Sequence, residues 1–107
     1  MFDYNLALNQ LTHTNNGSCV LACMIGAKNF AFSQVKNCVQ FDFRGCKKAS
    51  RCIITLGGND LYTMAFYSKK RTSLYFYEYL PVETMTDIYF TNLKSIFERF
   101  TGLYLSI

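Results

Sequence analysis

Three tyrosines at alternate positions are the residues whose spacing best fits a binding chemistry. They are Tyr75, Tyr77 and Tyr79. An extended strand over residues 73–80 would place all three rings on one face. The opposite face of this strand would carry apolar side chains that we expect to pack on a C-terminal helix: Leu74, Phe76 and Leu80. Rings in a row are typical of platforms on which nucleic-acid bases stack, at roughly 1–3 kcal/mol per base.

Basic residues are concentrated in the middle of the chain. From Lys28 to Arg71 the sequence has nine bases and two acids, a net charge of +7, whereas the whole chain carries +4. Cations of this kind neutralise phosphates and make binding salt-dependent. The candidate phosphate contacts are Lys28, Lys47, Lys48, Lys69, Lys70 and Arg71. Rings and cations together predict a nucleic-acid-binding face that favours single strands.

The same residues also have structural explanations, and the sequence leaves them open. The tyrosines could form a second hydrophobic layer under an N-terminal helix, or the interface of a homodimer. The lysines could simply solvate a small apolar domain. The segment Gly26–Asn29 has the composition of a hairpin turn that sets strand register, in which Lys28 would contact no ligand.

Catalytic and metal-binding motifs are not evident. His13 is the only histidine, and the five cysteines are neither in C-x-x-C pairs nor at the spacing of a zinc site. A nucleophilic pair of His13 with Cys19 or Cys23 would lack a third group to orient it. We therefore predict a protein that is not an enzyme, holds no cofactor or metal, and carries its cysteines as free thiols.

Length and composition predict one folded domain spanning residues 1–107. Half of the residues are apolar and 17% are aromatic, which is enough to bury a core. No apolar run is long enough to cross a membrane, so we expect no membrane association. The N-terminus lacks a basic segment followed by an apolar one, so we expect a cytoplasmic protein.

Hydrophobic periodicity predicts an α+β fold. We expect a short helix over residues 3–11, a buried strand over 19–25, and further strands that start at Phe30 and then cover 39–44, 51–56, 61–67 and 73–80. The expected inward-facing residues of the middle strands are Val39, Phe41, Phe43, Cys52, Ile54, Leu56, Tyr62, Met64 and Phe66. Short turns between the strands, including a charged one at 68–72, predict an antiparallel β-meander of about five strands.

The C-terminal part of the chain is predicted to be helical. Pro81 should end the sheet, and Thr84 with Asp87 resembles a helix cap. Apolar residues then recur at intervals of three and four: Met85, Tyr89, Leu93, Ile96, Phe100 and Leu103. Gly102 should end this helix, which we expect to cover one face of the sheet.

Short motifs near both ends resemble a family of small phage and prophage proteins. They are Met24–Phe30 (MIGAKNF), similar to a TGAKNF segment, and Thr101–Tyr104 (TGLY). The resemblance implies a phage setting and no particular activity. Two hypotheses follow from the surface and this setting. One is an accessory protein that binds nucleic acid; the alternative is an inhibitor that binds a host defence or regulatory protein, of the anti-CRISPR or anti-restriction type.

Overall fold

The computed structural model describes residues 4–71, 73–74, 76–103 and 105. Its elements, in chain order, are α1 (Tyr4–Thr12), α2 (Gly17–Ile25), β1 (Lys28–Ser33), β2 (Cys38–Asp42), β3 (Arg51–Leu56), β4 (Tyr62–Arg71), β5 (Tyr77–Ile88), the 3₁₀ turn η1 (Phe90–Asn92) and α3 (Leu93–Thr101). The five strands form one antiparallel sheet in the order β1-β2-β3-β4-β5. The predicted α+β meander with a short N-terminal helix and a C-terminal helix is confirmed.

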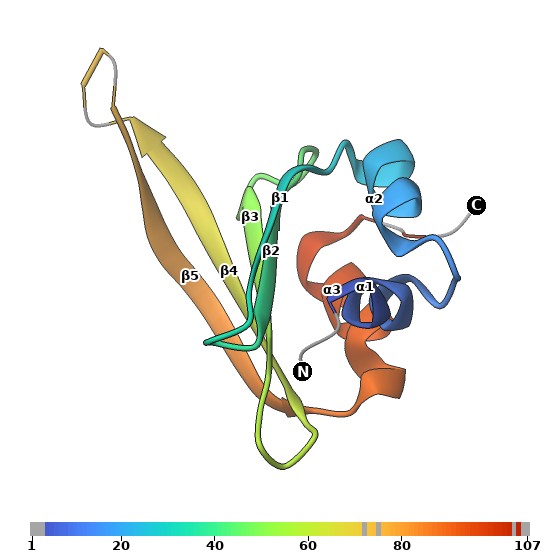
Figure 1. The fold of residues 1–107 in the computed structure, drawn as a ribbon. Helices are drawn as coiled ribbons and strands as arrows, with labels where there is room; N and C mark the ends of the chain where they lie inside the picture. Colours follow the sequence, from blue (N-terminus) through green and yellow to red (C-terminus); the bar gives the residue numbers. More distant parts are fainter. Residues whose placement is uncertain (1–3, 72, 75, 104, 106–107) are drawn as a thin grey trace.

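The three helices lie together on one face of the sheet, and the other face is open (Figure 1). Alternation along the central strands creates the buried face, because each strand turns its apolar residues toward the helices. The buried residues of these strands include Val39, Phe41, Cys52, Ile54, Tyr62, Met64 and Phe66. The inward face predicted from the sequence is therefore confirmed at these positions.

Helix α3 closes this core with two phenylalanines. The Phe97 ring is buried, with its centroid 5.5 Å from that of Phe43 and 5.8 Å from that of Phe66. One turn later, Phe100 stacks on Phe66 at 4.3 Å. Gly102 has φ 73° and donates its backbone N–H to the carbonyl of Glu98, so α3 ends as predicted.

The apolar run 19–25 belongs to helix α2, so the prediction of a buried strand there is wrong. The helix buries Gly17, Leu21 and Ile25, which stand four apart and form one stripe. Cys19, Ala22 and Cys23 are exposed, and Val20 and Met24 are half-buried. A continuous apolar run has no period of its own, and only this one-sided burial distinguishes a helix from a strand.

The turn predicted at Gly26–Asn29 is also wrong. Gly26 caps α2 with φ 65°, and Lys28 already belongs to β1. Asn29 has φ 58° at an irregularity in the register between β1 and β2. This segment thus joins a helix to a strand, and its left-handed residues reverse the chain between them.

Strand β5 continues through Pro81 to Ile88, which corrects the prediction that Pro81 ends the sheet and that a helix begins near Thr84. Because β5 is an edge strand, a proline that lacks an N–H can be accommodated there. The register shifts opposite Tyr67 and again near Asp87, which has φ 57°. The helix begins only at Leu93.

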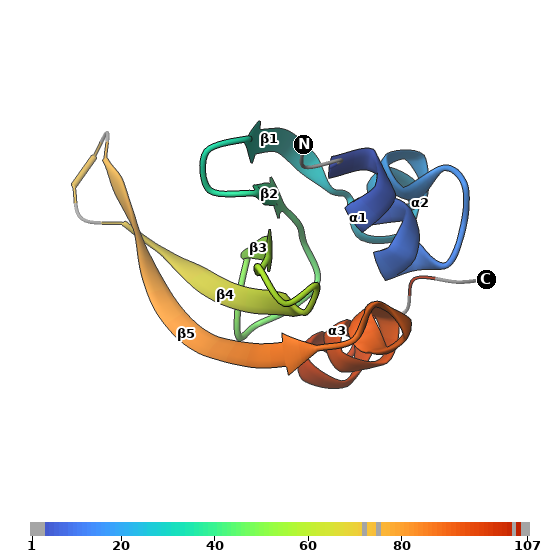
Figure 2. The ribbon, with the colours of Figure 1, turned by 60° about the horizontal axis from the view of Figure 1, so that its bottom comes forward.

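The β4–β5 hairpin extends beyond the rest of the sheet (Figure 1), and Figure 2 shows it curving away from the helices. Ser68–Arg71 end β4 and are not the predicted charged turn. The expectation that Leu74 and Phe76 pack on the C-terminal helix is wrong, since they are 74% and 69% exposed. None of the described helices reaches this part of the hairpin (Figure 2).

Candidate functional site

The sheet face turned away from the helices carries the candidate site, and we call it the open face. The pairs Asp42↔Arg51, Arg51↔Tyr67 and Lys69↔Tyr79 place their members on this face, because their strand neighbours Phe41, Cys52 and Phe66 point into the core. Tyr77 stands two residues from Tyr79 and shares its side of β5. The predicted alignment of these two tyrosines is found, and Tyr75 lies outside the described residues.

Tyr79 is covered by an arginine that is itself held by a carboxylate. The Arg51 guanidinium carbon lies 3.6 Å from the centre of the Tyr79 ring. Arg51 Nε donates to Asp42 Oδ1 at 2.7 Å, and the Asn29 side-chain amide donates to Asp42 Oδ2 at 3.0 Å. Stacking and ion pairing together fix the guanidinium flat on the ring.

The ionisation of Asp42 depends on these partners. Burial alone would raise its pKa, but the hydrogen bonds from Arg51 and Asn29, with the positive charge of Arg51, hold the pKa below its usual value. Asp42 in turn raises the pKa of Arg51, mainly through the same hydrogen bond. The pair therefore stays charged throughout the neutral range.

Replacement of Asp42 by asparagine is expected to lower the free energy of unfolding at pH 7 by about 1–3 kcal/mol, because Arg51 loses its ionic partner. Since the pKa of Asp42 is lowered by folding, its contribution is present at neutral pH and is lost as the pH falls through the folded value. Denaturant unfolding followed by circular dichroism at several pH values should show wild type and Asp42→Asn converging below about pH 4. A constant difference down to low pH would contradict the ion-pair account.

Tyr77 is the exposed ring of the open face. It is 53% exposed, and Lys69 Nζ lies 4.1 Å from its centre. Lys69 also lines a hollow of about 220 Å³ with Lys47, which comes from the β2–β3 loop. Two lysines distant in sequence thus line the same hollow.

A serine with a buried hydroxyl borders this hollow. Ser50 lines it, and its Oγ is a buried side-chain oxygen with no hydrogen-bond partner in the described part of the chain. The Ser50 backbone is fixed on both sides, since its N–H donates to the Tyr67 carbonyl and its carbonyl accepts from Phe43. The Ser50 hydroxyl is closed to solvent, so the two lysines are the groups of this hollow that are suited to contact a phosphate.

Two of the remaining predicted cations, Lys48 and Lys70, do not join the rings. Lys48 donates to the Phe100 carbonyl at 3.2 Å and lies over the Phe100 ring, where it caps α3 on the helix side. Lys70 pairs in register with Glu78, so alternation turns it away from Lys69. Lys28 is exposed at the start of β1, opposite Asp42. The side chain of Arg71 lies outside the described residues.

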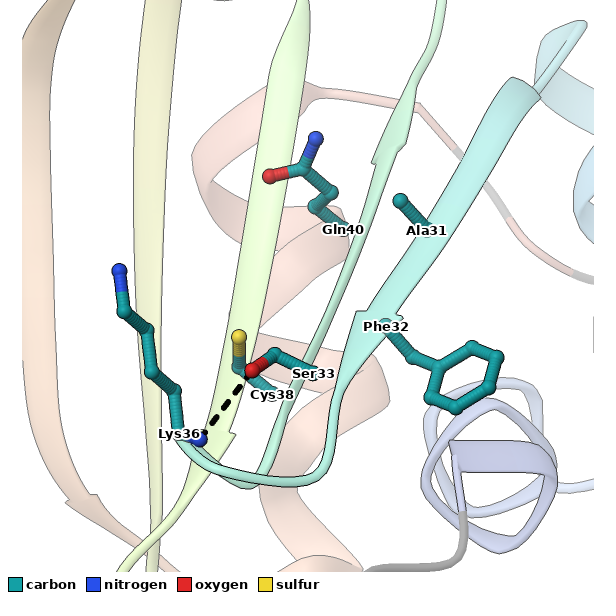
Figure 3. Close-up of a pocket in the computed structure, with 6 residues that line it drawn as sticks. All are labelled: Ala31, Phe32, Ser33, Lys36, Cys38 and Gln40. Carbon is teal, nitrogen blue, oxygen red and sulfur yellow. Dashed lines mark hydrogen bonds between the residues drawn. The ribbon is translucent and has the colours of Figure 1, made fainter.

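A second hollow lies at the other edge of the open face. It has a volume of about 220 Å³ and is lined by Ala31, Phe32, Ser33, Lys36, Cys38 and Gln40. Figure 3 shows Phe32 pointing away from Gln40, Cys38 and Lys36, and the Lys36 backbone N–H donates to Ser33 Oγ at 3.2 Å. Lys36 therefore adds a cation that sequence analysis did not select.

Arg51 and Asp42 are the other open-face residues that sequence analysis missed. Each stands at an outward-facing position of a predicted strand. The alternation of apolar and polar residues is the only feature of the sequence that indicates their place on this face. Their contact with each other and with Tyr79 depends on strand register, which hydrophobic pattern alone does not specify.

The five cysteines are free thiols, as predicted, and burial raises the pKa of Cys52. Among the residues that the structure describes, no group of three or more His, Cys, Asp or Glu side chains is placed to hold a metal. No described helix is both long and apolar enough to span a membrane.

No protein-family model, no curated protein and no solved structure matches this chain.

Proposed function

We propose that this protein is a non-enzymatic accessory protein of phage type that binds nucleic acid, with single strands favoured, on its open face. The observation that carries the proposal is the grouping of Tyr77, Tyr79, Arg51 and Lys69 on one surface. Rings provide stacking surfaces, and cations beside them neutralise the backbone. The phage setting rests on the resemblance of the two end motifs.

We infer different tasks for the two rings. Tyr77 has the larger exposed surface and is suited to stack directly on a base. Tyr79 supports Arg51, whose planar guanidinium can itself stack on a base or contact a phosphate. Unpaired bases present the flat surfaces that these groups require, whereas the bases of a duplex are already stacked on each other.

Replacement of Tyr77 by alanine is expected to weaken binding of a labelled oligothymidine by about 5- to 100-fold, the equivalent of one lost stacking contact. The measurement is fluorescence anisotropy over a range of salt concentrations. The slope of log K against log salt should change little, because the ring carries no charge.

The matched control is Tyr89→Ala, which removes an exposed tyrosine just beyond the opposite end of β5. It should bind as the wild type does. Absent or salt-insensitive binding at micromolar protein would overturn the proposal. A stoichiometric protein partner that survives nuclease treatment, with no oligonucleotide binding, would favour the host-protein inhibitor instead.

A further inference from the structure

The outer part of the β4–β5 hairpin is a two-stranded ribbon without a third strand. Strand β3 pairs with β4 only as far as Tyr67, whereas the β4–β5 ladder continues from Ser68↔Leu80 to Arg71↔Tyr77. We call the described residues between 68 and 80 the arm. Figures 1 and 2 show that it projects past the sheet and curves away from the helices.

The arm presents apolar side chains at its tip and cations on its stem. Leu74 and Phe76 are 74% and 69% exposed. Lys69 and Lys70, both exposed, alternate to opposite sides of the ribbon, so each side of the stem carries a lysine, Lys69 opposite Tyr79 and Lys70 opposite Glu78. A two-stranded ribbon has little core to stabilise it, and large apolar groups that are this exposed at its end offer a surface to a partner.

Nucleic acid matches this distribution of charge and apolar surface. Its phosphates are anionic and its base faces are apolar, and the two are a few ångströms apart along every strand. A duplex offers a whole base-pair face to a partner where it ends or opens into single strands. The stem and the rings of the open face lie on the same ribbon, so a strand leaving such an opening could continue along Tyr77 and Tyr79.

We propose that the arm is a wedge for the junction between duplex and single-stranded nucleic acid. This inference rests on the proposed function and names its substrate more closely. Leu74 and Phe76 stack on the last base pair of the duplex, Lys70 and Lys69 contact the phosphates that flank it, and the unpaired strand runs onto the open face. The reaction is binding only, and no bond is made or broken.

The test compares three labelled DNAs in fluorescence anisotropy: a single strand, a blunt duplex, and the same duplex with a single-stranded extension. Wild type is expected to bind the extended duplex about 10-fold more tightly than the single strand, the equivalent of one added stacking contact. The double variant Leu74→Ser/Phe76→Ser should bind both equally, with unchanged affinity for the single strand. A 2-aminopurine in the last base pair should change fluorescence with wild type and not with the variant.

The matched control is Val35→Ser/Phe90→Ser, which removes one aliphatic and one aromatic side chain, 94% and 52% exposed, outside the arm. It should keep the junction preference. Single-strand binding without that preference, or a preference that persists in the arm variant, overturns the wedge and leaves the proposed function standing. Absent single-strand binding overturns both proposals. A protein partner that wild type captures and the arm variant does not overturns the wedge alone.

Discussion

Replacement of Phe97 by alanine is expected to lower the free energy of unfolding by about 3–5 kcal/mol, a large share of the 5–15 kcal/mol typical of a small domain. Phe97 is fully buried and contacts the rings of Phe41, Phe43 and Phe66. Phe41 lies in β2, Phe43 follows that strand directly, and Phe66 lies in β4. One side chain of α3 therefore joins the helix layer to the sheet. The cavity left by its removal would lie between the two layers.

The measurement is equilibrium unfolding in urea followed by far-ultraviolet circular dichroism, since the chain has no tryptophan. Phe90→Ala is the control, because it removes an identical side chain that is 52% exposed. It should change the free energy of unfolding by no more than about 0.5 kcal/mol. Equal effects of the two substitutions would contradict the assignment of Phe97 to the core.

The central strands were predictable because each buries only one face. Period-two alternation at Val39, Phe41 and Phe43 reports directly on which side chains meet the helices. The same alternation predicted that Cys52 and Ile54 face the core, and both are buried. Strand order also followed, since short connections between consecutive strands favour antiparallel neighbours.

The helix boundaries were not predictable in the same way, because tertiary contacts decide them. Met85 and Tyr89 happen to stand at helical spacing ahead of Leu93, yet Met85 pairs with Met64 in the sheet. An edge position tolerates Pro81, and bulges absorb the extra residues of β5. Edge position, bulges and cross-strand pairing cannot be recognised from the local pattern of hydrophobic residues.

The candidate site was predictable where it depends on alternation within one strand and unpredictable where it depends on neighbours across strands. Tyr77 and Tyr79 share a face because they stand two apart. Lys47 and Lys69 line the same hollow because the β2–β3 loop lies next to β4, whereas the neighbouring Lys48 bonds to α3 instead. A run of cations in the sequence therefore says little about which of them act together.

Replacement of Gly17 by alanine is expected to destabilise the protein by at least about 3 kcal/mol, beyond the usual cost of an added methyl group. A Cβ at this position would lie 2.4 Å from the backbone carbon and oxygen of Leu8, so α1 and α2 would have to separate. The hydrogen bond from the Gly17 N–H to Asn9 Oδ1, now 2.8 Å, would be strained as well. Side-chain rearrangement cannot relieve the contact, because the atoms it meets are backbone.

The matched substitution is Gly58→Ala, where an added Cβ would meet nothing within 4 Å. It should leave the free energy of unfolding within about 0.5 kcal/mol of the wild type or raise it slightly, by restricting the unfolded chain. Urea unfolding of both variants measures the difference. If Gly17→Ala proved as stable as Gly58→Ala, the close approach of α2 to α1 would be wrong. The placement of the Cys19–Ile25 run as a helix packed on α1 would then fail with it, because this glycine is what lets two backbones meet.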